Sequence, residues 1–178
     1  MSMFPIASQT VGSGGASSVI FSSIPQTFTH LQVRMFAKST NTSGTVQYGF
    51  AIPNNDLTTS LYAVHYLTGD GATASSGSAI NSSQFSVYNL PGSTSAIASQ
   101  VFGSAIIDIL DYANTNKNKT SRSIGGFDAN GSGQISLTSN LYQSTTAITS
   151  LGMYISGNLV AGSRLDLYGI STSNATGA

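Results

Sequence analysis

The segment that begins at Asp128 carries oxygen-bearing side chains at alternate positions, as the first half of a calcium-binding loop does. Asp128, Asn130 and Ser132 are the candidate ligands, and a glycine and an apolar residue follow shortly after them. Only one of the three is a carboxylate, and the twelfth position of such a loop would be Ser139 instead of a bidentate Glu. The Asn-Gly pair at 130–131 is a strong signal for a tight turn between two strands. A hairpin is therefore favoured over a cation site, and we expect no bound metal.

The two histidines, His30 and His65, are the other residues that could do chemistry, and each lies within a predicted strand. Serines are abundant, so a Ser-His-Asp set can be drawn on paper with Asp56, Asp70 or Asp108. However, the chain has no G-x-S-x-G motif, and no acidic residue lies at a sequence distance from either histidine that would indicate a catalytic triad. We expect both histidines to be structural or to lie at an interface.

Glycoside hydrolysis needs two carboxylates that face one cleft. Asp108 and Asp111 are three residues apart and flank apolar residues, so we expect them to close a strand. The glycine-rich run Gly12–Gly15 leads into a strand instead of a helix, which does not suit a phosphate-binding loop. The absence of Cys removes thiolate chemistry and zinc-thiolate sites. We therefore expect no catalytic residue and no cofactor, and the chain is not expected to be an enzyme.

The composition excludes several further classes of protein. Of 178 residues, six are Lys or Arg and six are acidic, which gives 7% charged residues and a formal net charge of zero. A charge-neutral chain with scattered basic residues does not fit a nucleic-acid-binding surface. No apolar run is long enough to span a bilayer, and the start at Met1–Pro5 does not resemble a signal peptide. Hydrophobic residues still reach 40%, enough to form a core.

Short runs in which apolar and polar residues alternate are separated by clusters of turn-forming residues, the pattern of half-buried strands. In the clearest run Leu31, Val33 and Met35 fall on one face and polar residues fall on the other. The segment Thr73–Ser83, rich in Ser, Gly and Ala, is interpreted as a long or poorly ordered loop. The predicted strands are Ser17–Ser23, Phe28–Lys38, Thr45–Ala51, Leu61–Leu67, Gln84–Tyr88, Ser99–Leu110, Ser121–Phe127, Gln134–Tyr142, Ile148–Ser156 and Arg164–Ile170.

About eight to ten strands without a convincing helix predict an all-β fold, either two packed antiparallel sheets or a barrel. We expect a jelly-roll-like antiparallel β-sandwich. The predicted organisation is an N-terminal arm over residues 1–15, a single sandwich domain over 16–170, and a flexible C-terminal tail over 171–178.

Two groups of residues are predicted to contact other protein. The arm is too apolar and Gly-rich for an ordinary exposed terminus, so Phe4, Ile6 and Val11 are expected to reach a partner. Tyr62 and Tyr66 share one face of a predicted strand, where they could stack on sugar rings or pack against a neighbouring subunit. Packing against a subunit is favoured.

The two ends of the chain carry motifs that resemble a known family. Ile6–Gly12 leads into Ser17–Phe28, which contains F-S-S-I-P, and near the C-terminus Thr146–Leu151 precedes Gly162–Ile170, which ends in L-Y-G-I. Together these segments resemble a widespread group of tailed-bacteriophage virion proteins, common in phages of cyanobacteria and other aquatic hosts. The resemblance covers the middle of the chain poorly, and the chain has Phe28 where the group tends to have Tyr.

The resemblance implies a jelly-roll domain on a virion surface, either as a capsid decoration (cement) protein or as part of a tail fibre. The compact single domain with little charge favours a decoration protein that oligomerises, as a homotrimer, on the major capsid protein and stabilises the shell by protein–protein contacts. The alternative is a tail-fibre or receptor-binding domain that recognises host glycans. Neither function needs a nucleic acid or a membrane as partner.

Overall fold

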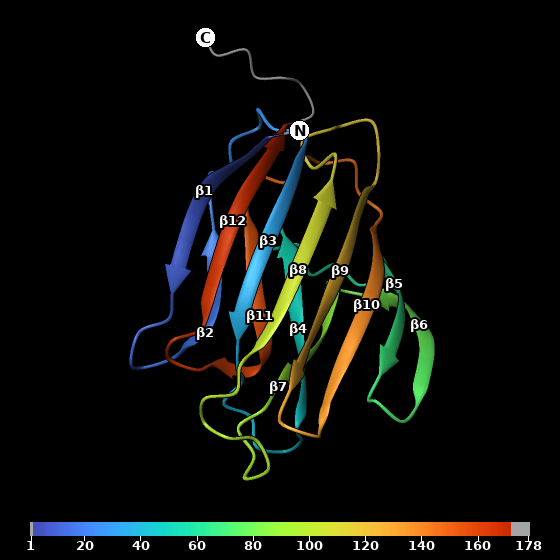
Figure 1. Cartoon of the computed structure of the whole chain (residues 1–178). Coiled ribbons are helices and arrows are strands. Elements are labelled where there is room, and N and C mark those ends of the chain that lie inside the picture. The colour runs from blue at the N-terminus through green and yellow to red at the C-terminus, as the bar shows by residue number, and fades with distance from the viewer. Residues whose placement is uncertain (1, 172–178) are drawn as a thin grey trace.

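The computed structural model describes residues 2–171, which form two antiparallel β-sheets packed face to face (Figure 1). Within these residues there are twelve strands and no helix that could cross a bilayer. The strands are β1 (Ser2–Thr10), β2 (Ala16–Phe21), β3 (His30–Ala37), β4 (Val46–Pro53), β5 (Tyr62–Gly69), β6 (Ala74–Ser82), β7 (Phe85–Pro91), β8 (Gly103–Leu110), β9 (Lys119–Asp128), β10 (Gly133–Tyr142), β11 (Leu151–Leu159) and β12 (Arg164–Ser171).

The strand order identifies a jelly roll at the centre of the fold. The larger sheet has the order β1-β12-β3-β8-β9-β10-β5-β6, and the smaller sheet has the order β2-β11-β4-β7. β1 pairs with β12, β2 with β11, β3 with β8 and β4 with β7, so the first half of the chain pairs with the second half in a nested way. Nested pairing across two four-stranded sheets is the jelly-roll arrangement. The predicted antiparallel, jelly-roll-like β-sandwich is confirmed.

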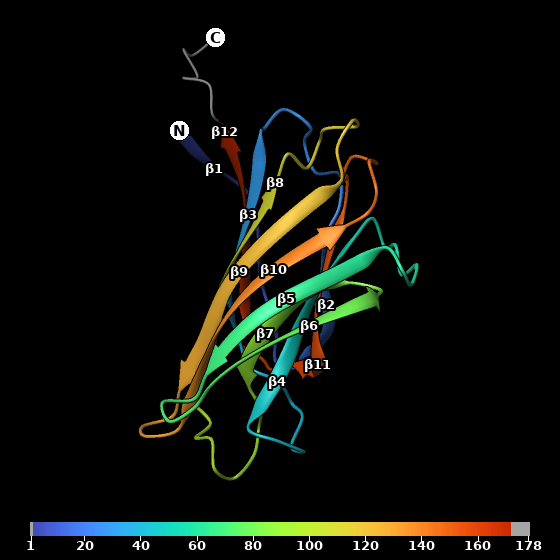
Figure 2. The same cartoon turned by 90° about the vertical axis from the view of Figure 1, so that its right-hand side faces the viewer.

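Two hairpins are added to this eight-stranded core. β5 and β6 lie between β4 and β7 in the sequence, and β9 and β10 lie between β8 and β11. Both hairpins join the same edge of the larger sheet, next to β8. Figure 2 shows how the twist of this sheet accumulates, so that the added strands run diagonally to β3 and β8. We call β9, β10, β5 and β6 the added strands.

The apolar core lies between the two four-stranded parts of the jelly roll. Leu31 and Val33 of β3, Leu165 and Leu167 of β12, and Ile107 of β8 are completely buried on the inner face of the larger sheet. These residues alternate with exposed or half-buried ones, as expected for strands with one buried face. The smaller sheet supplies Phe21, Ala51, Leu151, Met153 and Leu159 to the same core.

The strand count exceeds the predicted eight to ten because two segments were not recognised as strands. Residues 2–10, predicted as a separate arm, form β1 and pair with β12 of the same chain, with a bulge between Pro5 and Ala7. Residues 73–83, predicted as a loop, contain β6, which pairs with β5 at the outer edge of the sheet. The predicted tail lies outside the described residues apart from Ser171, which belongs to β12.

Candidate functional site

In the middle of the added strands β9 and β10, polar side chains lie on the inner face and large apolar side chains lie on the outer face. Their inner side chains are each at most 3% exposed: Ser121, Ser123, Ser136, Thr138 and Asn140. By contrast Ile124, Ile135 and Leu137 lie on the outer face and are 50%, 58% and 51% exposed. This is the reverse of the usual arrangement in a sandwich, where the apolar face of each strand packs on the opposite sheet.

Hydrogen bonds to β7 stabilise the polar inner face at Thr138 and Asn140. The side-chain oxygen of Asn140 accepts a hydrogen bond from the backbone N–H of Ser86 at 2.9 Å, and its amide nitrogen donates to the Ser86 carbonyl at 3.2 Å. The Thr138 hydroxyl pairs with that of Ser123 and also donates to the Ser86 carbonyl. Buried polar groups are stable when they are paired. Because these inward polar groups are paired, the strands are stable with their Ile and Leu side chains on the outer face.

On the outer face four large apolar residues lie side by side across four neighbouring strands. Ile106 of β8 is opposite Ile124 of β9, Ile124 is opposite Leu137 of β10, and Leu137 is opposite Leu67 of β5. We call these four residues the apolar row. Ile106 is 40% exposed and Leu67 is 51% exposed. Contiguous exposed apolar surface of this kind marks interaction sites in soluble proteins.

A hollow of about 600 Å³ adjoins the apolar row toward the hairpin turns. Its lining includes Ser104, Gly126 and Gly69, which occupy outward positions next to the row. A Cβ atom added at Gly126 would come within 2.3 Å of the Gln134 carbonyl oxygen, so that position has no room for a side chain. The hollow therefore has a floor of small residues beside a ridge of large ones.

On the jelly-roll side the same face carries charged and polar side chains, together with Phe36, which is 48% exposed. Asp166 accepts hydrogen bonds from Ser8 and from the Arg164 guanidinium, and the Arg34 guanidinium lies 5.3 Å from the Tyr168 ring centre. Burial raises the pKa of Asp166, but the hydrogen bonds and the nearby positive charges outweigh it and hold that pKa below its ordinary value. The apolar row thus ends where this charged region begins, because Arg34 is directly opposite Ile106.

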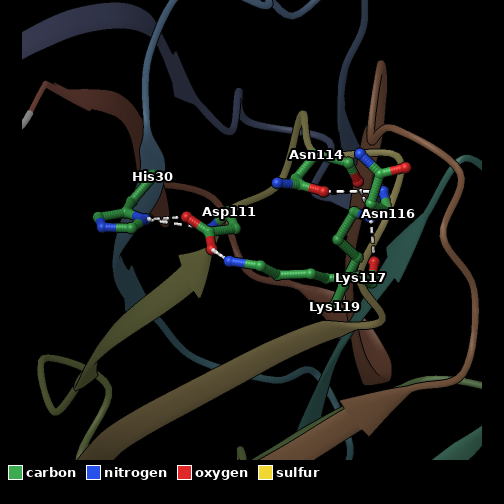
Figure 3. A network of polar contacts seen from close by, with 6 residues as sticks. All are labelled: His30, Asp111, Asn114, Asn116, Lys117 and Lys119. Atoms are coloured by element: carbon green, nitrogen blue, oxygen red, sulfur yellow. Dashed lines mark hydrogen bonds and ion pairs between the residues drawn. The ribbon is translucent and has the colours of Figure 1, made fainter.

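His30 belongs to a polar network that holds the loop after β8 (Figure 3). Its Nδ1 accepts a hydrogen bond from the backbone N–H of Asp111 at 3.0 Å, and the Asp111 carboxylate pairs with Lys117 at 3.0 Å. Lys119 is fully buried and donates to the carbonyl oxygens of Asn114, Lys117 and Thr145. Burial lowers the pKa of Lys119, and the charge of Asp111 opposes this effect. Apart from the ion pair between Asp111 and Lys117, these contacts hold backbone groups of the loop, which supports a structural role for the network.

The other candidate acids and the second histidine lie apart from this network. Asp108 is on the outer face of β8 and accepts a hydrogen bond from Gln32 at 2.8 Å, whereas Asp111 follows the strand in the turn. His65 lies exposed on β5, opposite Ser139 of β10. The expected close of the strand at Asp108 and Asp111 agrees with the end of β8 at Leu110.

The turn between β9 and β10 is the hairpin that the sequence predicts. Asn130 and Gly131 have φ values of 60° and 107°, and the Ala129 N–H donates to the Ser132 carbonyl at 2.6 Å. Two central residues with positive φ are typical of a type I′ hairpin turn. The Asp128 carboxylate accepts a hydrogen bond from the Asn130 N–H at 2.7 Å. Across residues 2–171 no three His, Cys, Asp or Glu side chains gather where they could hold a metal ion.

The prediction that Tyr62 contacts a partner is wrong, because its side chain is completely buried. Its ring stacks on Tyr142 with centroids 4.6 Å apart, and its hydroxyl donates to the Asp56 carbonyl at 2.8 Å. Tyr66 shares the inner face with Tyr62, as predicted, but is half-buried over Gly77 of β6. The alternation on β5 was interpreted correctly, and only the choice of the exposed face was wrong.

The three predicted contact residues of the N-terminal segment lie in different environments. Val11 is 4% exposed and belongs to the core, which corrects its assignment to an interface. Ile6 is half-buried against the core. Phe4 is 37% exposed and stacks on Phe28 with centroids 5.7 Å apart, so part of its ring still faces outward.

The apolar row was missed by the sequence reasoning. In β9 and β10 apolar and polar residues alternate along the strand, so one face is apolar and the other is polar. From this pattern alone, the face with Ile and Leu is predicted to be the buried one. The only available signal is composition: a sandwich core built from Ser121, Ser123, Ser136 and Thr138 leaves Ile and Leu to the outer face.

Comparisons with known proteins add little to this geometry. No protein-family model matches the chain, and no curated protein matches it. Among solved structures the chain is similar to a protein of unknown function from Shewanella oneidensis MR-1, with 11% identity over 98% of this chain and 78% of that one. The TM-score of that match is 0.23, too low to carry an argument about fold or function.

Proposed function

We propose that this chain is a structural virion protein, a capsid decoration protein that works by binding other protein and carries out no reaction. The observation that carries the proposal is the apolar row on the outer face of the larger sheet. Four large side chains exposed in register across neighbouring strands suit a surface that another protein covers. The jelly roll recurs in viral capsid domains, although it also occurs in lectins and other proteins.

The remaining features support the same proposal. The low charge of the chain suits surfaces that meet protein, and the motifs near both termini resemble phage virion proteins. We propose the virion surface as its location and the major capsid protein and further copies of itself as its partners. The homotrimer that the resemblance implies stays a prediction.

The alternative, a tail-fibre domain that recognises host glycans, has lost one of its supports. That interpretation used Tyr62 as a possible sugar-stacking ring, and Tyr62 is buried. Its remaining supports are the family resemblance and Tyr66, which is half-buried.

The copy number of the chain in purified virions tests the proposal. A copy number that scales with that of the major capsid protein, measured by quantitative mass spectrometry, supports a decoration protein. A copy number that matches a tail protein supports the tail-fibre alternative instead, and absence from virions contradicts both. Capsids assembled without the chain are then expected to release their genome at a lower temperature than capsids that carry it.

A further inference from the structure

The outer face of β8, β9, β10 and β5 carries a row of large side chains beside a row in which three of the four positions are small. The apolar row forms a ridge of four large side chains: Leu67, Leu137, Ile124 and Ile106. The next outward position on the same four strands, toward the hairpin turns, is occupied by Gly69, Ile135, Gly126 and Ser104. Three of these four are small, and all four line the hollow. The positions beside the ridge are therefore open on β5, β9 and β8, whereas Ile135, which is 58% exposed, fills the position on β10.

The charged residues of β9 are also placed so that a two-fold rotation would bring opposite charges together. Its outward residues are, in order, Arg122, Ile124, Gly126 and Asp128, which means positive, large, small and negative. A two-fold axis that crosses the strand at residue 125 would lay position 124 of one copy over position 126 of the other. The same axis would lay Arg122 over Asp128 on both sides of the contact. A face with this order is self-complementary in shape and in charge.

The surroundings of the two charges are consistent with this pairing. Asp108 is opposite Arg122 on β8, but its carboxylate accepts its hydrogen bond from Gln32 of β3, on the side away from β9. Asp70, in the turn after β5, lines the hollow together with Asp128 and makes that end of the face more negative. Arg122 and Asp128 are both exposed, so a partner can reach them.

We propose that two copies of this chain pack face to face through the outer side of β8, β9, β10 and β5, with β9 antiparallel to β9 of the partner. The Ile124 side chain of each copy enters the hollow above Gly126 of the other, and Leu67 meets the space above Gly69. Packed sheets lie about 10 Å apart, a distance that such interdigitating side chains fill. The contact is isologous, so each favourable interaction occurs twice.

The inference deepens the proposed function, since it names the partner of the apolar row, and it rests on the proposal that the chain works by binding protein. A two-fold contact on this face leaves the rest of the surface available for a three-fold contact or for the capsid. Its occupant is nevertheless a second copy and not the major capsid protein, because the ridge, the small positions beside it and the opposite charges all lie on this one chain.

Sedimentation of the purified chain tests the proposal. The unchanged protein is expected to form dimers or larger even-numbered assemblies, and Ile124→Asp is expected to weaken the association at least about 100-fold, because a carboxylate would be buried twice in an apolar contact. Ile20→Asp is the matched control. Ile20 is 61% exposed on β2 of the other sheet, so this variant should associate as the unchanged protein does. Circular dichroism checks that both variants remain folded.

Charge reversal then tests the register. Arg122→Asp alone and Asp128→Arg alone are each expected to weaken association about ten-fold, because each places like charges together, and the double variant is expected to recover it. Failure of the double variant to recover association overturns the two-fold register.

Other outcomes separate the inference from the proposed function. A protein that stays monomeric at high concentration, or a trimer that Ile124→Asp does not affect, overturns the face-to-face pairing. A monomer that binds capsids through the apolar row also overturns it but leaves the decoration role intact. A dimer sensitive to Ile124→Asp, from a chain that is absent from virions, supports the pairing and contradicts the proposed function.

Discussion

β3 and the middle parts of β9 and β10 lie in the same sheet but place their aliphatic side chains on opposite faces. In β3 of the jelly roll, Leu31 and Val33 face the smaller sheet, and Gln32 and Arg34 face outward. In β9 and β10 serine, threonine and asparagine face inward and Ile and Leu face outward. The jelly-roll half of the sheet is therefore stabilised by apolar burial within the chain. The half made of the added strands is held by hydrogen bonds to β7 and by the buried rings of Tyr62 and Tyr142, and the Ile and Leu side chains in the middle of β9 and β10 stay exposed.

The comparison is tested most strongly by removing one leucine from each half. Leu31→Ala is expected to lower the free energy of unfolding by about 3 kcal/mol, because Leu31 is completely buried and leaves a cavity. Leu137→Ala removes the same atoms from a side chain that is 51% exposed, and the loss should stay below about 1 kcal/mol. Urea denaturation in dilute solution measures both. Equal losses would mean that the outer face is already packed within a single copy.

The polar interior of the added strands gives the next largest expected effect. Asn140→Leu keeps the approximate size of the side chain but leaves the buried Ser86 N–H without its partner. We expect a loss of about 2 kcal/mol in the free energy of unfolding, again by urea denaturation. A gain in stability would show that this interior accepts apolar packing, which would contradict the proposed division between the halves.

A smaller effect of opposite sign is expected at Ser121. Its hydroxyl is buried, and among the described residues it has no hydrogen-bond partner. Ser121→Ala removes an unpaired buried polar group, so the free energy of unfolding should rise by up to about 1 kcal/mol. Ser139→Ala, at an exposed position on β10, is the control and should leave stability unchanged. A clear loss of stability in Ser121→Ala would show that the Ser121 hydroxyl does have a hydrogen-bond partner in the folded protein.

The smallest expected effect concerns acid stability, through the contact that ties β10 to the loop after β4. Hydrogen bonds from Thr58 and Tyr142 lower the pKa of Asp56, against a weaker opposite effect of burial. A lowered pKa in the folded state stabilises the fold above the ordinary Asp pKa, and this contribution is lost as the pH falls through the lowered value. The Tm of the unchanged protein should therefore fall below about pH 4, and it should fall less steeply in Asp56→Asn.

Much of the jelly roll could be predicted from the sequence because its strands follow the simplest rule of sheet packing. Period-two alternation in β3 gave the correct buried face, and the Asn-Gly pair at 130–131 gave the correct hairpin. Two strands were not predicted, for physical reasons. β1 carries Pro5 and a bulge, and β6 consists mostly of Ser, Ala and Gly, so both have few of the β-branched residues that usually indicate a strand.

The candidate site could not be predicted because alternation does not say which of two faces is buried. Tyr62 and Tyr66 were placed correctly on a common face, yet that face turned out to be the inner one. In β9 and β10 the choice of face depends on Ser86 of β7, which lies more than fifty residues before Asn140 in the sequence. Such a long-range contact leaves no local signal in a single sequence.

The nested pairing of the strands has a consequence for how the protein is made. β12, the last strand, lies between β1 and β3, and its pairing joins Ser2 to Ser171. While the ribosome is still building the chain, the first strand has no neighbour with which to complete the sheet. Contacts this distant in sequence form slowly, so the larger sheet is complete only once β12 has paired with both β1 and β3. Until then, β3 has an unpaired edge on the side of β12, and unpaired strand edges favour aggregation.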